Sequence, residues 1–219
     1  GEVVVFHDSD FMKLAGQNLK IWDANMGDLE QIDIGSRFGP EFNGERVPTL
    51  SQVLAECKGK VGVNIELKYY GHDQQLEQRV IDVVEAAGVE SEVMFMSLKM
   101  EAVKKFKSLR PDWRVGLLMS VSVGSVADIQ ADFLAVNAGF ANQMFVRTAH
   151  SHHKDIYVWT VNDAVTMSTM IGRGVDGLIT DDPALARSVI EQRRQMTPAE
   201  RMVLHMANLF GVAGKIAEQ

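Results

Sequence analysis

The segment Asn64-Ile65-Glu66-Leu67-Lys68 places a carboxylate and an ammonium group two residues apart at the end of an apolar run. Strand alternation puts Asn64, Glu66 and Lys68 on one face and the two apolar residues on the other. A glutamate and a lysine that face the inside of a barrel are costly to bury unless they pair or bind something. A hard cation on Glu66 and a phosphate oxygen on Lys68 would satisfy both, and a structural Glu–Lys pair is the alternative.

A histidine follows another apolar run near the start of the chain. His7 and Asp8 come directly after residues 3–6, which are predicted to form a strand. Histidine is the natural proton-transfer group near neutral pH, and a neighbouring aspartate can orient or charge it. The alternative is a turn in which His7 has no chemical role and Asp8 is a cap.

Two further motifs lie late in the chain. Trp159, within Val158–Asn162, is either a core residue or the apolar wall of a small-molecule pocket. The run Gly174–Pro183 indicates a short strand followed by an aspartate-capped helix. We interpret that run as architectural, with Asp181 and Asp182 as metal ligands being the less favoured alternative.

A histidine cluster is formed by His150, His152 and His153. His150 and His153 are three residues apart and can share one face of a helix. Because the pattern offers no carboxylate partner, a solvated helix end is favoured over a metal site.

These side chains need a scaffold, and the dominant pattern is short apolar strands that alternate with helices. Strands are predicted at residues 3–6, 62–67, 93–97, 115–119, 133–136, 157–161 and 177–180. Helices are predicted around the apolar stripes of residues 50–57, 75–87, 100–109, 163–171 and the tail. Continuous apolar strands suit a parallel sheet covered on both faces, so an α/β fold is expected, either open or closed into a barrel.

Two segments interrupt this alternation. Residues 8–48 are long, rich in Gly and Asp and weakly periodic, and loops of this length are uncommon unless they serve a site. The tail carries the capping pattern Thr197-Pro198-Ala199-Glu200 before an amphipathic helix. That helix is expected to pack on the domain, with an oligomer or membrane-surface contact as the alternative.

Composition limits the partners. The formal net charge is −7, which argues against non-specific nucleic-acid binding because such binding needs clustered Lys and Arg. An anionic small molecule held by a local cation remains compatible with this charge. The single cysteine, Cys57, excludes an intrachain disulfide and leaves the redox compartment open. A cytoplasmic or membrane-associated location is expected.

Taken in order, these motifs resemble the glycerophosphodiester phosphodiesterase family. The matching elements are Val3–Asp8, Arg46–Leu54, Asn64–Lys68, Met96–Ser97, Val158–Asn162 and Gly174–Pro183. Each one is weak alone, but the ordered set is specific. The resemblance implies a TIM (β/α)8 barrel with its site at the C-terminal face, and hydrolysis of glycerophosphodiesters to glycerol 3-phosphate and an alcohol.

The resemblance also implies roles for single residues. His7 matches a catalytic histidine that protonates the leaving alcohol, Glu66 a metal ligand, Lys68 a phosphate-contacting lysine, and Trp159 a residue of the substrate pocket. A divalent cation, Mg²⁺ or Ca²⁺, is implied as cofactor. In this family the nucleophile is the substrate's own glycerol hydroxyl, which gives a cyclic intermediate.

One departure from the family pattern matters. The family opens with a His-Arg-Gly strand, a Pro-Glu-Asn-Thr helix and a Glu-x-Asp strand, and none of these precedes Gly1. We therefore expect a fragment that lacks the first two barrel strands, with Val3–Phe6 as an extra strand. Residues 1–190 would form the barrel and residues 191–219 a helical extension. By itself this chain is expected to bind metal poorly and to be inactive.

Two other functions remain open at this stage. One is a non-catalytic binding or structural barrel that has lost the N-terminal motifs. The other is a related phospholipase-type barrel that acts on lipid phosphodiesters, against which the long segment 8–48 and the Val158–Asn162 motif argue. Membrane contact could arise through upstream sequence or through the C-terminal helix.

Overall fold

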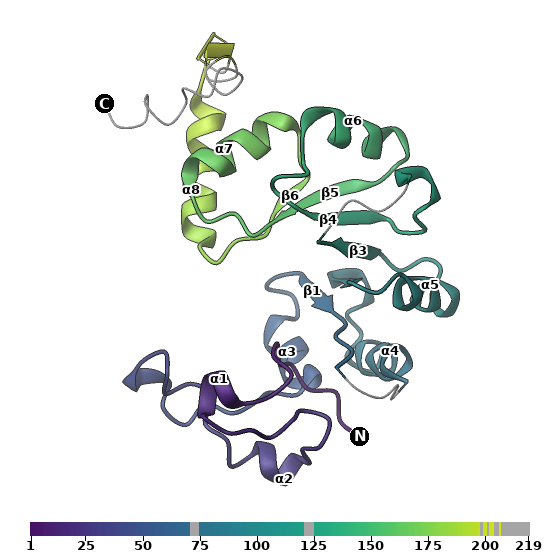
Figure 1. Cartoon of the computed structure of the whole chain (residues 1–219), viewed down its shortest axis with the longest axis vertical. Helices are drawn as coiled ribbons and strands as arrows, with labels where there is room; N and C mark the ends of the chain where they lie inside the picture. The colour runs from purple at the N-terminus through teal and green to yellow at the C-terminus, as the bar shows by residue number, and fades with distance from the viewer. Residues whose placement is uncertain (71–74, 121–124, 198, 201, 204–205, 207–219) are drawn as a thin grey trace. The chain divides into compact units, whose positions relative to one another are not determined.

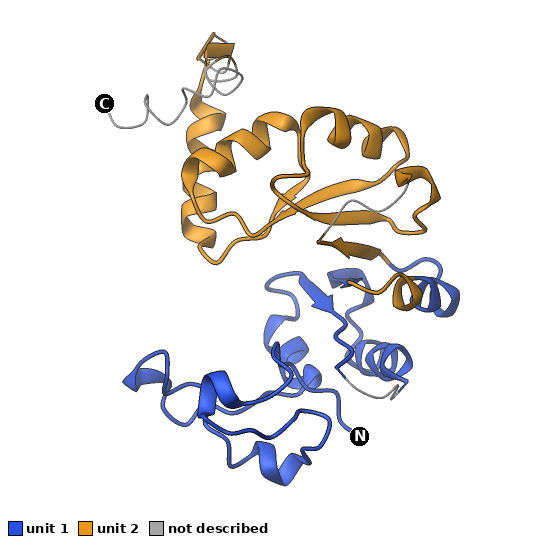
Figure 2. Cartoon of the chain, in the orientation of Figure 1, with its two compact units in different colours: residues 1–97, 104–113 blue, residues 98–103, 114–219 orange. Residues whose placement is uncertain are grey.

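The computed structural model describes residues 1–219 apart from 71–74, 121–124, 198, 201, 204–205 and 207–219 (Figure 1). The chain divides into two compact units (Figure 2). Unit 1 comprises Gly1–Ser97 and Lys104–Trp113, and unit 2 comprises Leu98–Val103 and Arg114–Gln219. Helix α5 (Met100–Leu109) forms where its apolar stripe predicted a helix, and it contributes residues to both units. No helix in the described part of the chain is long and apolar enough to cross a membrane.

Unit 1 contains two parallel strands, β1 (Val63–Glu66) and β2 (Val93–Ser97), which pair from Val63 opposite Val93 to Glu66 opposite Met96. Helix α4 (Leu76–Ala87) and the short helix η2 (Glu90–Glu92) connect them. Helix α4 ends at Gly88, whose φ of 62° is the left-handed conformation that favours glycine. This strand–helix–strand order is the predicted parallel α/β pattern.

Helix α3 (Leu50–Cys57) shows how local sequence sets an element boundary. The Thr49 side chain accepts a hydrogen bond from the Gln52 backbone N–H, and the Gln52 side chain accepts one from the Thr49 N–H. These two bonds form a capping box, which satisfies N–H groups that have no partner inside the helix.

The predicted first strand, Val3–Phe6, does not form. Its residues make one antiparallel bridge, Val4 with Thr49, and the flanking backbone bonds from Val5 to Pro48 and from Leu50 to Val3 are 2.9 and 2.8 Å long. The segment lies against the chain just before α3, and Phe6 packs on Phe11 with ring centroids 4.5 Å apart. Val4 and Phe6 therefore pack against a local core, whereas Val5 is exposed.

The long segment 8–48 folds as a lobe with its own core. It contains the short helices α1 (Met12–Ala15), α2 (Met26–Leu29) and η1 (Pro40–Phe42). The buried members of this core are Phe11, Leu29, Ile32 and Val47.

Unit 2 carries four parallel strands in chain order: β3 (Val115–Met119), β4 (Phe133–Asn137), β5 (Asp155–Trp159) and β6 (Gly177–Leu178). The short helix η3 (Val126–Asp128) precedes β4, and α6 (Gln143–Ser151), α7 (Ala164–Arg173) and α8 (Pro183–Gln195) follow β4, β5 and β6. Figure 1 shows α6 and α7 on the same side of these strands.

Two predicted strands in unit 2 have boundaries that differ by two residues from the structure. β5 lies two residues earlier than residues 157–161, because its ladder with β4 starts where Asp155 N–H bonds Asp132 at 3.2 Å. β6 ends at Leu178 rather than Thr180, because the following residues turn into the cap of α8. Helix α8 continues to Gln195, so residues 191–195 belong to it, and the separate extension 191–219 stays a prediction because most of that tail lies outside the described residues.

Candidate active site

Glu66 and Lys68 form an ion pair at the C-terminal end of β1. Lys68 Nζ lies 3.0 Å from Glu66 Oε1, and the two side chains are 19% and 20% exposed. Leu67, between them, is buried. The predicted same-face arrangement is therefore present. Because both charged groups are partly open to solvent, they can be reached by a ligand of either sign without unfolding the strand.

Asn64 lies on the same face of β1, two residues before Glu66. Its Nδ2 donates to Met96 Sδ at 3.3 Å, while its Oδ1 is buried without a hydrogen-bond partner among the described residues. An orphaned buried carbonyl oxygen beside a carboxylate is the type of oxygen donor that Mg²⁺ and Ca²⁺ prefer. Six-coordinate binding needs more ligands, and the described residues contain no group of three or more His, Cys, Asp or Glu that could hold a metal. The donor set thus has the right chemistry but is incomplete.

His7 lies in the same unit with an exposed ring. Its Nδ1 is 2.7 Å from Asp8 Oδ1, and the side chains are 76% and 28% exposed. The His7 carbonyl accepts a hydrogen bond from the Tyr70 hydroxyl at 2.5 Å, which ties it to the segment that follows β1. Lys68 Nζ is 5.9 Å from the centroid of the same Tyr70 ring. Tyr70 therefore contacts both His7 and Lys68, and sequence reasoning missed it.

A buried carboxylate anchors the other side of this segment. Glu77, in the first turn of α4, is only 2% exposed. The Tyr69 hydroxyl donates to its Oε1, and Lys105 Nζ lies 2.8 Å from its Oε2. Such a charge is tolerated in the interior because it is both paired and hydrogen-bonded. The sequence offered no local signal for it, since Tyr69, Glu77 and Lys105 come from three different elements.

Trp159 is the last residue of β5, in unit 2, and is partly buried. Its indole N–H donates to the Ala135 carbonyl of β4 at 3.0 Å. The bond satisfies the polar end of the ring, so the indole is held at the strand end. Its role as a pocket wall stays a prediction.

The polar residues after β5 and β6 bond one another. Asn162 Oδ1 accepts from the Thr180 hydroxyl at 3.0 Å and from the Asp181 N–H at 2.9 Å, and its Nδ2 donates to Asp181 Oδ2 at 2.7 Å. Asp182 caps α8 by accepting from the Leu185 N–H at 2.9 Å. This network agrees with the architectural interpretation, including the predicted aspartate cap.

The histidine cluster differs from the expectation in one respect. His150 has a carboxylate partner, because its Nε2 lies 2.8 Å from Asp176 Oδ2, which also accepts from the Ile156 N–H at 2.7 Å. The pattern missed this partner because Asp176 is 26 residues away. His150 lies in the last turn of α6, where His152 is the C-cap residue, and all three histidines are exposed, as predicted for a solvated helix end.

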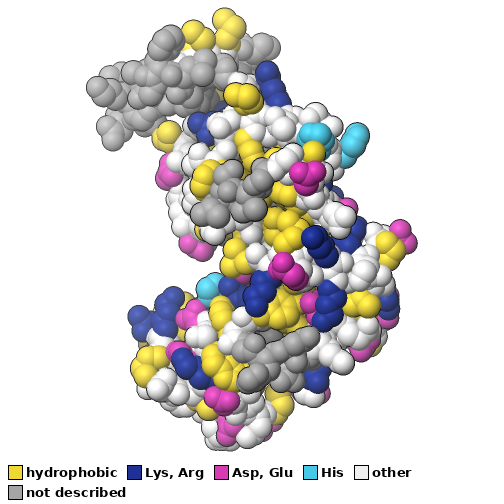
Figure 3. Space-filling model, turned by 45° about the vertical axis from the view of Figure 1, so that its right-hand side comes forward, with side chains coloured by type: hydrophobic (Ala, Val, Ile, Leu, Met, Phe, Trp, Pro, Cys, Tyr) yellow, Lys and Arg dark blue, Asp and Glu magenta, His cyan; other side chains and the backbone are white. Residues whose placement is uncertain are grey.

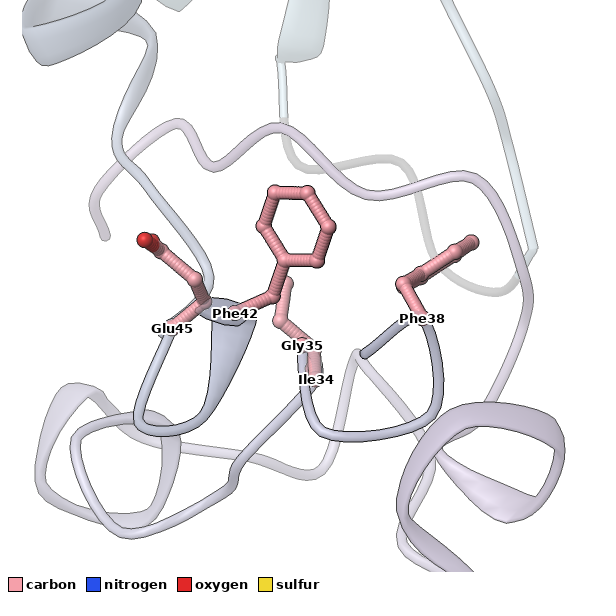
Figure 4. Close-up of a pocket in the computed structure, with 5 residues that line it drawn as sticks. All are labelled: Ile34, Gly35, Phe38, Phe42 and Glu45. Carbon is pink, nitrogen blue, oxygen red and sulfur yellow. The ribbon is translucent and has the colours of Figure 1, made fainter. Parts of the chain in front are cut away.

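A pocket of about 350 Å³ lies in the segment 8–48, apart from the candidate catalytic side chains. It is lined by Ile34, Gly35, Phe38, Phe42 and Glu45. Phe38 and Phe42 project toward the same open side in Figure 4, and they are 70% and 45% exposed. Asp33 fixes this loop by accepting from the Ser36 and Gly44 N–H groups, which hold the pKa of its carboxyl well below the usual range.

Charges of both signs share the molecular surface. On the face that Figure 3 shows, Lys and Arg side chains of the described residues are interspersed with Asp and Glu. Binding to the phosphate backbone of nucleic acids needs clustered cations instead. The expectation of a small-molecule partner rather than a nucleic acid stays a prediction.

Known proteins resemble this chain over most of its length. A family model described as Glycerophosphoryl diester phosphodiesterase family matches residues 1–185. A glycerophosphodiester phosphodiesterase of Caldanaerobacter subterraneus is 28% identical, over 84% of this chain and 78% of its own length. One of Bacillus subtilis is 27% identical, over 86% of this chain and 72% of its own.

Solved structures give the same result at the level of fold. The structure of an Oleispira antarctica phosphodiesterase in complex with the product sn-glycerol-3-phosphate matches with a TM-score of 0.80 and 22% identity, over 86% of this chain and 79% of that one. A glycerophosphodiester phosphodiesterase from Agrobacterium tumefaciens matches with a TM-score of 0.74 and 20% identity, over 87% and 82%. The predicted TIM-barrel class is confirmed.

The fold matches that of barrel enzymes that hydrolyse phosphoric diesters. Because the family model covers residues 1–185, the chain belongs to the glycerophosphodiester phosphodiesterase family. The predicted family and enzyme class are thereby confirmed.

Proposed function

We propose that this chain supplies part of the active site for hydrolysis of glycerophosphodiesters to glycerol 3-phosphate and an alcohol. The observation that carries the proposal is the partly exposed Glu66–Lys68 pair at the end of a parallel strand, in a chain of this family. In barrel enzymes the catalytic groups lie at the C-terminal ends of the strands. The product complex of the Oleispira antarctica phosphodiesterase supports a small glycerol-phosphate ligand.

Lys68 and Glu66 would divide the binding of the phosphodiester between them. Lys68 is a compact cation that can donate to a phosphate oxygen. Glu66, with the orphaned Asn64 oxygen behind it, would be a ligand for Mg²⁺ or Ca²⁺. When bound, such a cation neutralises and orients the phosphate oxygens. Substrate binding would separate the ion pair, since each partner then has a new contact of opposite charge.

His7 would provide the proton that the leaving alcohol needs. Its ring is exposed and its Nδ1 is held by Asp8, so Nε2 remains available for a substrate. An imidazole can donate a proton to a leaving group and regain one within a catalytic cycle.

A second candidate is a non-catalytic barrel. The incomplete metal-ligand set of the described residues favours it for this chain alone. The two candidate functions predict different residues encoded upstream of Gly1. Carboxylates and a second histidine read in frame before Gly1 would complete the enzyme, whereas a non-catalytic barrel would gain no such groups.

The test compares two proteins in the same assay. One is the 219-residue chain, and the other, called the extended protein, is translated from the first in-frame start codon upstream of Gly1. With glycerophosphocholine as substrate, we expect glycerol 3-phosphate from the extended protein and none from the 219-residue chain. Chelation with EDTA should lower the rate by at least about 100-fold, and Mg²⁺ or Ca²⁺ should restore it.

Two results would contradict this proposal. An extended protein that releases no glycerol 3-phosphate with either cation would favour the non-catalytic barrel. Metal-dependent turnover by the 219-residue chain itself would show that its own ligand set is sufficient.

A further inference from the structure

The segment that follows β1 is held on both of its sides, and one of its residues reaches His7. We propose that Tyr70 is a positioning residue for His7, whose carbonyl its hydroxyl fixes beside the Glu66–Lys68 pair. This inference deepens the proposed function and rests on it for the role of His7. The proposed role of Tyr70 is to act through His7 and not on the substrate.

His7 needs a tether of this kind because its own side-chain contacts do little to fix its position. The ring is 76% exposed, and its side-chain partner, Asp8, is the next residue in the chain. A bond between neighbours orients the ring but does not place it relative to Lys68. The Tyr70 hydroxyl, 63 residues away in sequence, bonds the backbone of His7 at 2.5 Å and does place it. Proton transfer depends on such placement, since small displacements of a catalytic group cost much of the rate.

Tyr70 can serve as a tether because its own segment is rigid. Leu67 is buried, its N–H bonds Met96 at 2.8 Å, and its carbonyl accepts the Ser97 hydroxyl at 3.0 Å. Tyr69 then bonds the buried Glu77. The backbone on both sides of Lys68 is therefore fixed to β2 and α4.

Alternation along this segment separates structural side chains from functional ones. The Leu67 side chain is buried, and the Tyr69 hydroxyl bonds the buried Glu77 of α4. Lys68 and Tyr70 lie together on the other side, with Nζ 5.9 Å from the ring centroid. Tyr70 thus contacts Lys68, the proposed phosphate-binding residue, through its ring. Its hydroxyl bonds the backbone of His7, the proposed acid.

The chain offers a matched pair of hydroxyl deletions. Tyr70→Phe removes the bond to His7 but keeps the ring beside Lys68. Tyr69→Phe removes an equivalent hydroxyl from the neighbouring residue and leaves Glu77 with one partner fewer. We expect Tyr69→Phe to lower the Tm, because a buried acceptor loses a bond, and Tyr70→Phe to leave the Tm unchanged within the error of the measurement.

The experiment follows histidine and backbone signals by NMR in the 219-residue chain while sn-glycerol 3-phosphate is added. In the wild-type protein the His7 ring signals, assigned with a His7→Gln variant, should shift together with the amide of Tyr69. In Tyr70→Phe the Kd read from Tyr69 should stay within about twofold, because Lys68 is intact, while the His7 shift is lost and its signals sharpen to those of a mobile loop.

In the extended protein the same variant should lower kcat by about tenfold and leave KM unchanged, since placement and not binding is lost. A His7 response that survives Tyr70→Phe, or that Tyr69→Phe abolishes equally, would overturn the tether. If sn-glycerol 3-phosphate shifts no signal in the wild-type chain, the proposed phosphate site fails instead. In that case the tether is tested by the His7 signals of the protein without ligand. If Tyr70→Phe leaves these signals unchanged, the tether is rejected, and if it sharpens them, the tether is supported.

Discussion

The ends of β1 and of β5–β6 carry similar polar residues but use them differently. After β6, Asp181 and Asn162 bond each other, and Asp182 caps a helix, so their polar atoms are engaged in turns. After β1, Glu66 and Lys68 pair with each other, Lys68 also lies over the Tyr70 ring, and both charged side chains remain partly exposed. A polar residue at a strand end is therefore a candidate for chemistry only when its own turn does not use its hydrogen bonds. Both sets belong to motifs that resemble the family, and the sequence analysis favoured chemistry for the first set and an architectural role for the second.

The largest expected effect is the difference in kcat between variants of the two histidines that have aspartate partners, His7 and His150. His7→Gln in the extended protein should lower kcat by about 100- to 10,000-fold, the usual contribution of a general acid, and remove one limb of the pH profile. His150→Gln, at the end of α6 in unit 2, should leave kcat unchanged because His150 bonds Asp176 at a solvated helix end. Steady-state assays across pH measure both. If both variants lost kcat equally, the loss would depend on the His–Asp pairing itself and not on the position of His7 near the end of β1.

A smaller effect is expected from a glycine in the architectural motif of unit 2. A Cβ on Gly177 would come within 2.2 Å of the Tyr157 ring. Gly177→Ala should therefore destabilise the protein by about 1–3 kcal/mol, the usual cost of overpacking. Urea unfolding measures the change, and kcat per folded molecule of the extended protein should not fall. A stable variant with low kcat would contradict the architectural interpretation of this motif.

The smallest effect concerns the loop of the segment 8–48. The Ser36 and Gly44 N–H groups lower the pKa of Asp33 below its ordinary value. A lowered folded-state pKa adds stability above the unfolded pKa of about 4, and this stability is lost as the pH falls toward the folded value. Amide exchange protection in residues 33–44 should therefore fall below about pH 4 in the wild-type chain. Asp33→Asn should remove that pH dependence, and an unchanged dependence would assign the acid sensitivity to another group.

Elements with a strong local signal were predictable. β2 and β3 were predicted at their observed bounds, because continuous apolar runs end abruptly at polar residues. The capping box of Thr49 and Gln52 and the aspartate cap of α7 at Asp163 were also predictable, since a cap depends on residues three apart. The facing of Glu66 and Lys68 followed from strand alternation alone.

Features that depend on contacts between distant residues were not predictable. Tyr70 reaches His7 across 63 residues, and His150 reaches Asp176 across 26, with no pattern to announce either bond. Val3–Phe6 had a strand-like composition, but its Val4 and Phe6 side chains pack against the local core around Phe11. In each case tertiary contacts decided the outcome over local propensity.

The central claim is that the polar residues at the end of β1 take part in catalysis, whereas those at the end of β6 stabilise the fold. The most direct test measures glycerol 3-phosphate release by the extended protein carrying Glu66→Gln or Asp181→Asn. The Glu66 variant should lose about 1,000-fold or more in kcat per folded molecule. The Asp181 variant should lower the Tm and keep its kcat. Wild-type turnover by Glu66→Gln, or a comparable loss of kcat in Asp181→Asn, would contradict the account.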